Sequence, residues 1–470
     1  MRRPLTFAAA MASLVSALPL AAQTATPPPL GTPKPFAVPA SETYTLPNGM
    51  AVTLIPYGTT PKAVMMLDVY AGGVNEADRV WLSQLAAEMT KQGAAGKSAG
   101  QIATAAADMG GSLNVVPGEE KTSFAIDVLS EHAGHAVQLL GDVATRPDFP
   151  AGEFERVKAD AARRLALTMS QPGTLATAAL YKRYYGAEHP YGRYVPTQGQ
   201  LSAYTLADAK AFHAANYGAK RAHLYVAGRF DAAAVKAAVS KAFGGWAPGA
   251  ERARAPYTPA AGPVVLLVDR PGAPQSTMRL AFPAPAGATA GDVPERVSNA
   301  MLGGMFSSRI TRNIREDKGY TYSPGSSVQF WPGAATWVFQ ADVTTASTGA
   351  SVTEVFKEIR GLQTTTPPAA EVTGARNYLA GLFVIQNATA QSLINSMAQR
   401  DGLNWPKDWL QTYVPAVLAV TPAQVQQAAV ATQPIDKATL VVVGDLATVE
   451  PQLRALPELK GVTFQRVTVP

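Results

Sequence analysis

The stretch RAHLYVAGRFDAAAVKAAVSKAF at residues 221–243 has a counterpart in ATLVVVGDLATVEPQL at residues 438–453. Each begins with a short run of apolar and β-branched residues that ends in glycine, which is typical of a buried strand, and each continues with helical spacing. The two glycines, Gly228 and Gly444, lie 216 residues apart (444 minus 228). A strand and helix at the same place in two halves indicate that the chain contains a duplicated unit.

The beginnings of the two halves correspond as well. The first half opens with MAVTLIPY and AVMMLDVYAGG at residues 50–57 and 63–73, and the second opens with PVVLLVDRPG and QSTMRLAFPAPAG at residues 263–272 and 275–287. A helical segment, alternating strand patterns and further helices follow in each half. Because runs of strands are separated from runs of helices, this order predicts an α+β fold of two homologous domains, each a mainly antiparallel sheet with helices packed on one face.

Proline-rich segments indicate where these domains begin and end. The segment TATPPPLGTPKPFAVPAS lies ahead of the first strand, and APGAERARAPYTPAAG lies near the middle of the chain. Such compositions are typical of extended linkers. We therefore expect a lead-in at residues 23–41, a first domain at residues 42–250, a linker at residues 251–261 and a second domain at residues 262–470.

The first 22 residues have the pattern of a secretory signal peptide. Arg2 and Arg3 form a positive beginning, residues 5–20 are mainly apolar, and Ala21 and Ala22 offer small side chains for cleavage. The alternative is an N-terminal membrane anchor, but Ser13, Ser16 and Pro19 interrupt the short apolar run. We expect an exported protein that resides in the periplasm of a Gram-negative bacterium.

Composition excludes several classes of protein. The chain has 470 residues, of which 47% are hydrophobic and 16% charged, so it is not intrinsically disordered. It has no cysteine, which excludes disulfides, thiolate metal sites and thiol nucleophiles. Without Arg2 and Arg3 the net charge falls from +6 to +4 (38 basic minus 34 acidic residues), and no basic run suggests nucleic acid as a partner. No later apolar run of 18 residues predicts stable membrane insertion.

Three local motifs, together with the duplication, resemble a known family. They are HPYGR at residues 189–193, FHAANY at residues 212–217, and Ser308-Arg309 followed by REDKGYTY at residues 315–322. This chain is similar in these motifs to the insulinase/pitrilysin-type zinc peptidases, in their short bacterial branch. The last motif is the most specific, because it resembles the family signature SRL…REKKGLAY. The resemblance implies that the two domains are arranged around a cleft.

Active members of this family carry the zinc motif H-x-x-E-H on the first helix of the first half. Two histidines four residues apart bind zinc from one helical face, and the glutamate activates water. On the corresponding helix this chain has Gln84 and Glu88 at the histidine positions and Ala87 at the position of the general base. A carboxamide is a poor zinc ligand and a methyl group cannot accept a proton. The following helix reads Arg163-Arg164 where the third, acidic ligand is needed.

Another metal site is the remaining possibility for independent hydrolysis. His132 and His135 lie three residues apart on an expected helix, so they could share a metal, but no Glu-His neighbour completes a ligand set. The other histidines, His189, His213 and His223, occur singly. We therefore expect no metal or other cofactor in this chain, and no peptide hydrolysis by this chain alone.

The second half keeps two residues that the resemblance identifies as functional. An apolar stripe predicts a helix over residues 299–314, and Lys318-Gly319 supplies its stop. Arg315 and Tyr322, seven residues apart, can converge across this turn. In active members the equivalent pair binds the substrate backbone and the oxygen that becomes negative during attack, and the resemblance implies that role here. The residues alone also allow Arg315 to bind helix carbonyls and Tyr322 to pack in a core.

The first half lacks the zinc ligands and the general base, whereas the second half keeps Arg315 and Tyr322. This combination suggests that two different chains share the work of hydrolysis. We expect a non-catalytic, substrate-binding subunit of a heteromeric zinc metallopeptidase, in which a homologous partner with an intact H-x-x-E-H motif supplies zinc and base. The substrate would be a peptide or unfolded polypeptide, held by backbone pairing along the strand at residues 326–331. Two alternatives stay open. One is a stand-alone peptide-binding or scaffold pseudo-peptidase, and the other is a self-sufficient metallopeptidase with unusual ligands.

Overall fold

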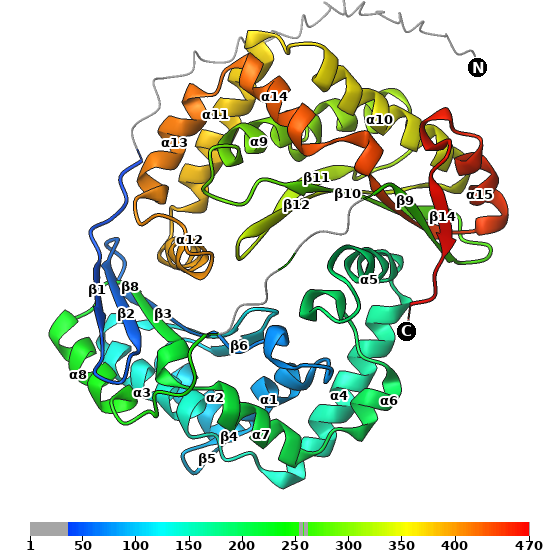
Figure 1. Cartoon of the computed structure of the whole chain (residues 1–470). Coiled ribbons are helices and arrows are strands. Elements are labelled where there is room, and N and C mark those ends of the chain that lie inside the picture. Colours follow the sequence, from blue (N-terminus) through cyan, green and yellow to red (C-terminus); the bar gives the residue numbers. More distant parts are fainter. Residues whose placement is uncertain (1–35, 253–256, 258–261, 470) are drawn as a thin grey trace, which may run out of the picture. The chain divides into compact units, whose positions relative to one another are not determined.

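The computed structural model of the chain describes residues 36–252, residue 257 and residues 262–469 (Figure 1). The expected signal peptide at residues 1–22 lies outside the described residues, as do most of the lead-in and most of the linker. Among the described residues, no helix combines the length and apolar character that a membrane crossing requires.

The first half of the chain forms a six-stranded, mainly antiparallel sheet. Its strands stand in the order β1-β2-β8-β3-β7-β6, and β2 and β8 are the one parallel pair. Apolar residues of these strands are buried because alternate side chains point to each face of the sheet. The strands are β1 (Glu42–Thr45), β2 (Ala51–Pro56), β3 (Lys62–Val69), β6 (Leu113–Pro117), β7 (Thr122–Leu129) and β8 (Ala222–Gly228).

The helices of the first half pack mainly against this sheet and against one another. A small hairpin, β4 (Gly93–Ala94) and β5 (Lys97–Ser98), lies between the first two helices. The helices are α1 (Leu82–Thr90), α2 (Ala99–Asp108), α3 (Ala133–Thr145), α4 (Ala151–Ser170), α5 (Pro172–Tyr185), α6 (Gln198–Ala203), α7 (Leu206–Asn216) and α8 (Ala232–Phe243).

The second half forms a sheet with the same central arrangement. Its order is β11-β12-β10-β13-β9-β14, so β13 lies parallel to β9 just as β8 lies parallel to β2. The two repeated strand segments therefore occupy equivalent places, which confirms the predicted α+β fold with two homologous domains. The strands are β9 (Val264–Asp269), β10 (Gln275–Ala284), β11 (Gly325–Trp331), β12 (Ala334–Thr344), β13 (Thr439–Gly444) and β14 (Thr463–Arg466).

The helices of the second half differ from the sequence expectation at one place. The helix predicted over residues 299–314 is broken: after α9 come two π-helical turns, η5 (Ala300–Gly304) and η6 (Thr311–Asp317), separated by an extended Met305. Ser326 Oγ would lie 2.5 Å from a Cβ on Gly303, so this turn packs closely against β11. The helices are α9 (Asp292–Asn299), α10 (Thr348–Thr364), α11 (Ala369–Gln386), α12 (Ala390–Gly402), α13 (Trp409–Ala419), α14 (Pro422–Thr432) and α15 (Leu446–Arg454).

Each half lends one helix to the sheet of the other half. Helix α12 packs against β8 and β3 of the first sheet, and α5 packs against β13, β10 and β9 of the second sheet (Figure 1). Apolar residues of α12 and of the first sheet share one buried cluster. The side chain of Tyr225 in β8 also donates a hydrogen bond to Asp401 in α12, with 2.9 Å between the oxygens. Each sheet is therefore covered on its second face by a helix from the other half.

Candidate functional site

The helix that corresponds to the zinc-binding helix, α1, begins in an unusual way. Its N-cap residue, Trp81, has a left-handed backbone with φ of 69°, which is uncommon for a bulky side chain. The carboxylate of Glu76 accepts hydrogen bonds from the backbone N–H groups of Trp81 at 2.9 Å and Ser83 at 2.7 Å. These bonds satisfy donors that a helix N-terminus leaves unpaired. Glu76 thus fixes where α1 starts.

The three positions of the altered zinc motif lie in different environments on α1. Ala87 is fully buried in the first core, whereas Gln84 and Glu88 are half-buried. The carboxylate of Glu88 pairs with Lys91 at 2.9 Å. Gln84 offers an amide, Ala87 offers no polar atom, and Glu88 is already engaged by a cation. This donor set does not fit a zinc ion, which takes imidazole, thiolate and carboxylate ligands.

Elsewhere in the described part of the chain, the histidines form no larger cluster with acidic residues. The described residues hold no cluster of three or more histidine, cysteine, aspartate or glutamate side chains placed to bind a metal ion. The rings of His132 and His135 lie 6.3 Å apart, with Glu131 3.7 Å from His132. His213 bonds the carbonyl of Ala144 at 3.0 Å, and its burial lowers its pKa.

A cavity of about 260 Å³ lies beside Gln84 and contains two carboxyl groups. Burial raises the pKa of Glu76 to about 7. Burial, and then the charge of Glu76, raise the pKa of Glu119 to about 8. Sequence reasoning missed both residues. No spacing rule connects Glu76 with Glu119, because the fold brings them together from a turn before α1 and from the loop between β6 and β7.

Arg315 and Tyr322 lie together in the second half. The Arg315 guanidinium carbon lies 4.8 Å from the centre of the Tyr322 ring and 4.5 Å from the centre of the Phe306 ring. Its Nε lies 3.2 Å from a carboxylate oxygen of Glu316. Tyr322 is 79% exposed and Phe306 is 71% exposed, so neither ring is in a core. The two rings hold the guanidinium by cation–π contacts.

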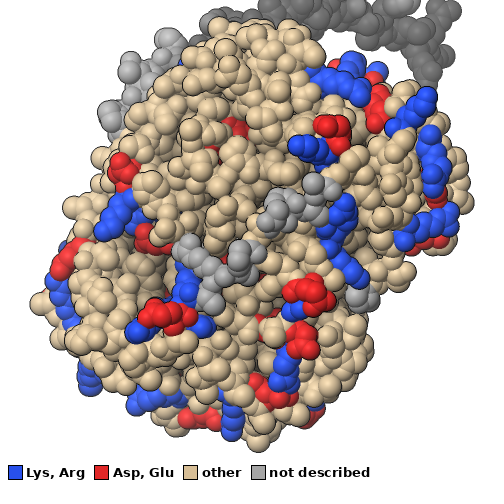
Figure 2. Space-filling view, viewed as in Figure 1, with Lys and Arg blue, Asp and Glu red and all other residues tan. Residues whose placement is uncertain are grey.

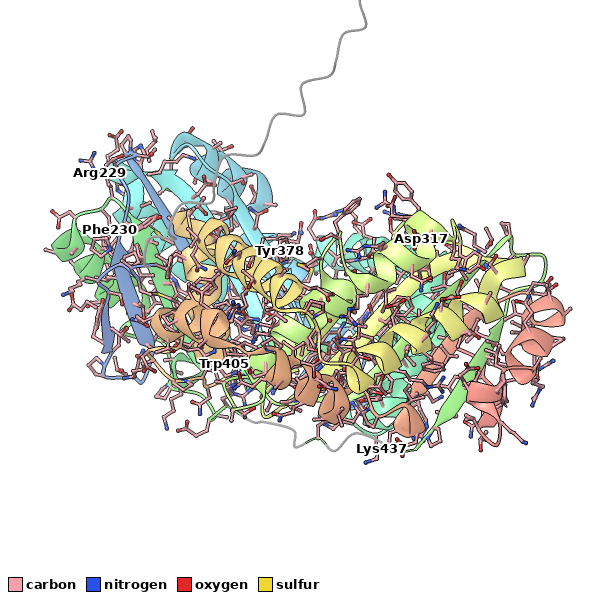
Figure 3. The ribbon with its side chains drawn as sticks, turned by 90° about the horizontal axis from the view of Figure 1, so that it is seen from above. Arg229, Phe230, Asp317, Tyr378, Trp405 and Lys437 are labelled. Atoms are coloured by element: carbon pink, nitrogen blue, oxygen red, sulfur yellow. The ribbon has the colours of Figure 1, made fainter. Side chains whose placement is uncertain are left out.

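The turn between Arg315 and Tyr322 explains why these side chains meet. Gly319 has a left-handed backbone with φ of 65°, which ends the η6 turn. Thr321 then bridges to Val343 of β12, and its hydroxyl donates to the carbonyl of Asp342 at 2.7 Å. Because Thr321 is held to β12, the backbone of Tyr322 begins at a defined position beside the sheet. Figure 3 labels Asp317, the last residue of the η6 turn.

The cavity at Arg315 and Tyr322 is separate from the cavity at Gln84. It has a volume of about 360 Å³, and residues 303–306, 311 and 322–327 form most of its wall. The two cavities share no lining residue, and they belong to different halves of the chain. One chain therefore brings Arg315 and Tyr322 together, but it does not bring them to Gln84, Ala87 or Glu88.

The HPYGR motif forms a turn that contacts both halves of the chain. Arg193 of HPYGR donates to the carbonyls of Ala77 and Ala187 and pairs with Glu188 at 3.0 Å. The ring of Tyr191 lies 4.3 Å, centre to centre, from the ring of Trp331 at the end of β11. Tyr191 thus packs the end of β11 in the second half against a loop of the first, whereas the bonds of Arg193 stay within the first half. On the face in Figure 2, acidic and basic side chains are interspersed and form no broad basic patch.

Comparison with known proteins assigns the family. Residues 52–193 match the family described as insulinase (peptidase family M16), and residues 203–379 match the family described as the peptidase M16 inactive domain. The chain belongs to the insulinase family of peptidases.

Among curated relatives are two proteins that are named uncharacterized zinc proteases. The chain is 27% identical to the protein of Bacillus subtilis (strain 168) over 290 residues, which cover 60% of this chain and 68% of the relative. It is 29% identical to the protein of Mycobacterium tuberculosis (strain H37Rv) over 243 residues, which cover 50% of this chain and 54% of the relative. The match thus spans about half the length of the mycobacterial relative.

Two solved structures have the same fold. One is a peptidase M16 inactive domain from Pseudomonas fluorescens, with a TM-score of 0.79 and 23% identity over 86% of this chain and 98% of that chain. The other is a protease from Helicobacter pylori, with a TM-score of 0.80 and 18% identity over 87% of this chain and all of that chain. The peptidase-like fold and the altered zinc motif together fit a non-catalytic member of the family.

Proposed function

We propose that this chain is the substrate-binding, non-catalytic subunit of a heteromeric zinc metallopeptidase. A homologous partner that carries an intact H-x-x-E-H motif supplies the zinc ion and the general base. The observation that carries this proposal is the contrast between the two cavities. Arg315 and Tyr322 meet at an open cavity, whereas Gln84, Ala87 and Glu88 provide no zinc ligand set.

The chemistry of this pair suits the binding of a peptide during attack on its carbonyl group. A guanidinium and a phenol both donate hydrogen bonds, and each is a good donor to an oxygen that becomes negative. The rings of Phe306 and Tyr322 orient the guanidinium of Arg315 before a substrate arrives. A preoriented donor loses less entropy on binding, so its effect falls mainly on the reacting state. The chain thus orients the substrate while its partner performs the hydrolysis.

The proposed location follows from the N-terminal sequence. The pattern at residues 1–22 supports export to a periplasm, where the partner would also carry a signal peptide. The stand-alone scaffold remains the second candidate. It makes no use of an exposed Tyr322 beside Arg315, which is why we favour the paired enzyme.

Reconstitution tests the proposal. The purified chain is mixed with its exported homologue that carries H-x-x-E-H, and cleavage of an unstructured quenched peptide is measured. We expect cleavage by the mixture and none by this chain alone. Arg315→Ala and Tyr322→Phe should each lower turnover roughly ten- to a thousandfold, as for lost oxyanion donors.

The matched control for this test is Arg312→Ala, since Arg312 is exposed on the same turn and does not line the cavity. Turnover with that variant should equal that of the native mixture. If the homologue cleaves at full rate without this chain, the paired enzyme is wrong and the scaffold function is favoured.

A further inference from the structure

The cavity of about 260 Å³ beside Gln84 lies between two segments that hydrogen bonds hold together. One is the turn η1 (Gly73–Asn75) ahead of α1, and the other is the loop at residues 118–121 between β6 and β7. The backbone N–H of Val74 donates to the carbonyl of Glu119 at 2.9 Å. A carboxylate oxygen of Glu119 lies so close to Gly73 that a Cβ at residue 73 would have no room. The position of the Glu119 carboxyl group is therefore set by the packing of these segments.

The two carboxyl groups in this cavity differ in their partners. Glu76 accepts two hydrogen bonds from backbone N–H groups, which use two of the roughly four acceptor positions of a carboxylate. Glu119 has no hydrogen-bond donor and no paired cation among the described residues. Burial is the main cause of the raised pKa of each group. A buried carboxylate without a cationic partner is costly, so this cavity favours the entry of a cation.

The protein's own cation on the cavity wall is bonded elsewhere. Among the described residues that line the cavity, Arg193 alone carries a positive charge. Its Nε donates to the carbonyl of Ala187 at 3.1 Å, one terminal nitrogen donates to the carbonyl of Ala77, and the other pairs with Glu188 at 3.0 Å. All three nitrogens of the guanidinium are thus engaged. Arg193 therefore does not neutralise the carboxyl groups in the cavity.

Aromatic and apolar side chains complete the wall. The buried Trp81 and the half-buried Tyr194 line the cavity together with Val80 and Val195. Aromatic rings attract organic cations through the negative charge of their faces. The amide of Gln84 adds a further hydrogen-bond acceptor. This combination suits a cation that donates several hydrogen bonds and carries an apolar stem.

The same residues are poorly suited to a metal ion. Calcium takes six to eight oxygen ligands, and magnesium requires a nearly ideal octahedron. The described residues hold no cluster of three or more side chains placed to bind a metal ion, and the oxygens of Glu76 already accept bonds from the start of α1. An ammonium group needs only acceptors around its three N–H donors.

We propose that this cavity binds a primary alkylammonium group, whose N–H groups donate to Glu119 and to the remaining acceptor positions of Glu76. This site goes beyond the proposed function, because neither Arg315 nor a zinc-bearing partner takes part in it. A lysine side chain and a free small amine both present an ammonium group on a flexible alkyl stem. Both are sources of the same ligand chemistry, and the experiments below distinguish them.

The first test uses the isolated full chain and n-butylammonium chloride at pH 8, with sodium chloride at equal ionic strength as the reference. We expect saturable binding in titration calorimetry and a rise in Tm that depends on the concentration of the amine. n-Butanol has the same stem without the charge and should bind roughly tenfold more weakly or less. If calcium, magnesium or zinc binds at this site and n-butylammonium does not, the cavity is a metal site and the proposal is wrong.

The second test changes the cavity. Glu119→Gln should weaken binding of n-butylammonium roughly tenfold or more, because it removes the charge that accepts from the ammonium group. Tyr194→Leu should weaken binding roughly three- to tenfold through loss of the ring. The matched control is Glu120→Gln, since Glu120 pairs with Arg252 at 3.1 Å and does not line the cavity. That variant should change the affinity by no more than about twofold. Native affinity in Glu119→Gln would overturn the proposal.

The third test identifies the source of the ammonium group. An unstructured peptide with blocked ends and one central lysine is compared with the same peptide carrying acetyl-lysine and with n-butylammonium. Tighter binding of the lysine peptide than of n-butylammonium assigns the site to a polypeptide side chain, and the reverse order assigns it to a free amine. If none of the three binds, the cavity does not take an alkylammonium group. These measurements use no partner chain, so their outcome is independent of the reconstitution experiment.

Discussion

Two carboxyl groups, those of Glu76 and Glu119, lie beside Gln84 where the family's zinc site would be expected. Glu76 is useful to the fold because it bonds two backbone N–H groups at the start of α1. Glu119 accepts no comparable bond from the described residues, and burial together with the charge of Glu76 raises its pKa to about 8. A buried acid of this kind prefers to be protonated. The altered zinc site is therefore a place of electrostatic strain at high pH.

The raised pKa of Glu119 predicts how stability depends on pH. The folded chain binds a proton on Glu119 more tightly than the unfolded chain does, so this group contributes stability below about pH 4.5 and loses that contribution as pH rises towards about 8. Glu119→Gln keeps the shape of the protonated acid without its charge. We expect this variant to raise Tm by about 2 °C at pH 8 and to change it little at pH 5.

The control for the pH experiment is Glu120→Gln, one residue along. The carboxylate of Glu120 pairs with Arg252 at 3.1 Å, so its neutralisation removes a favourable ion pair and should lower Tm at pH 8. Thermal unfolding followed by circular dichroism at both pH values measures each effect. If Glu119→Gln lowers Tm at pH 8 as Glu120→Gln does, the folded chain stabilises the charge of Glu119, and the predicted pH dependence is wrong.

At the scale of elements, a buried series of hydrogen bonds joins α12 to the first sheet, in addition to their apolar contact. The Tyr225 hydroxyl donates to Asp401, so it accepts from Nδ1–H of His223 at 2.8 Å, which leaves Nε2 to accept from Thr53 at 2.8 Å. This tautomer is assigned from the network. Burial lowers the pKa of His223 to about 4, so the imidazole is neutral in this arrangement at neutral pH.

Tyr225→Phe tests whether this bond holds α12 in place. Removing the hydroxyl leaves Asp401 with one fewer donor, and we expect the free energy of unfolding to fall by about 1.5–3 kcal/mol, the usual range for a hydrogen bond to a charged group. Tyr184→Phe is the matched control, because its buried hydroxyl has no hydrogen-bond partner among the described residues. That variant should be neutral or slightly stabilising. Equal losses in urea unfolding of both variants would mean that the hydroxyl bond to Asp401 contributes nothing.

The elements also show what could be predicted from sequence. The duplicated α+β unit was predicted from the strand patterns that end at Gly228 and Gly444, at corresponding places in the two halves. This was possible because alternation and β-branched residues are local properties of the sequence. The helix expected over residues 299–314 was wrong. Its apolar stripe is real, but close approach of Gly303 and Gly304 to Ser326 and Asn299 favours π-helical turns. Such a tertiary contact cannot be recognised from the periodicity of apolar residues.

Part of the candidate site could also be predicted, because its residues are close together in the sequence. Arg315 and Tyr322 are seven residues apart across a glycine turn, and the structure brings them together. Phe306 and Glu119 were not predicted as parts of a site. Phe306 reaches Arg315 only because the chain turns back after Gly304, and Glu119 meets Glu76 from a distant loop. Long-range contacts of this kind depend on the packing of whole elements.

At the scale of the whole molecule, neither half covers both faces of its own sheet. Helix α12 from the second half buries the first-sheet residues Met66, Tyr225 and Ala227, and α5 from the first half buries Leu266, Val441 and Val443. Hydrophobic patterning predicts that these helices are buried, but it does not say against which sheet. Two independently folding domains and two interdependent halves have the same sequence signature.

Separate expression of the two halves distinguishes these cases. We expect residues 36–250 alone to aggregate, since removing α12 exposes an apolar sheet face that includes the fully buried Tyr225. Residues 262–470 alone should behave in the same way without α5. Co-expressed, the two segments should form a soluble one-to-one complex with a single cooperative unfolding transition, because each supplies the missing helix. Size-exclusion chromatography and calorimetry measure both outcomes. If either half alone is monomeric and unfolds cooperatively, the exchanged helices contribute little to the stability of the two sheets.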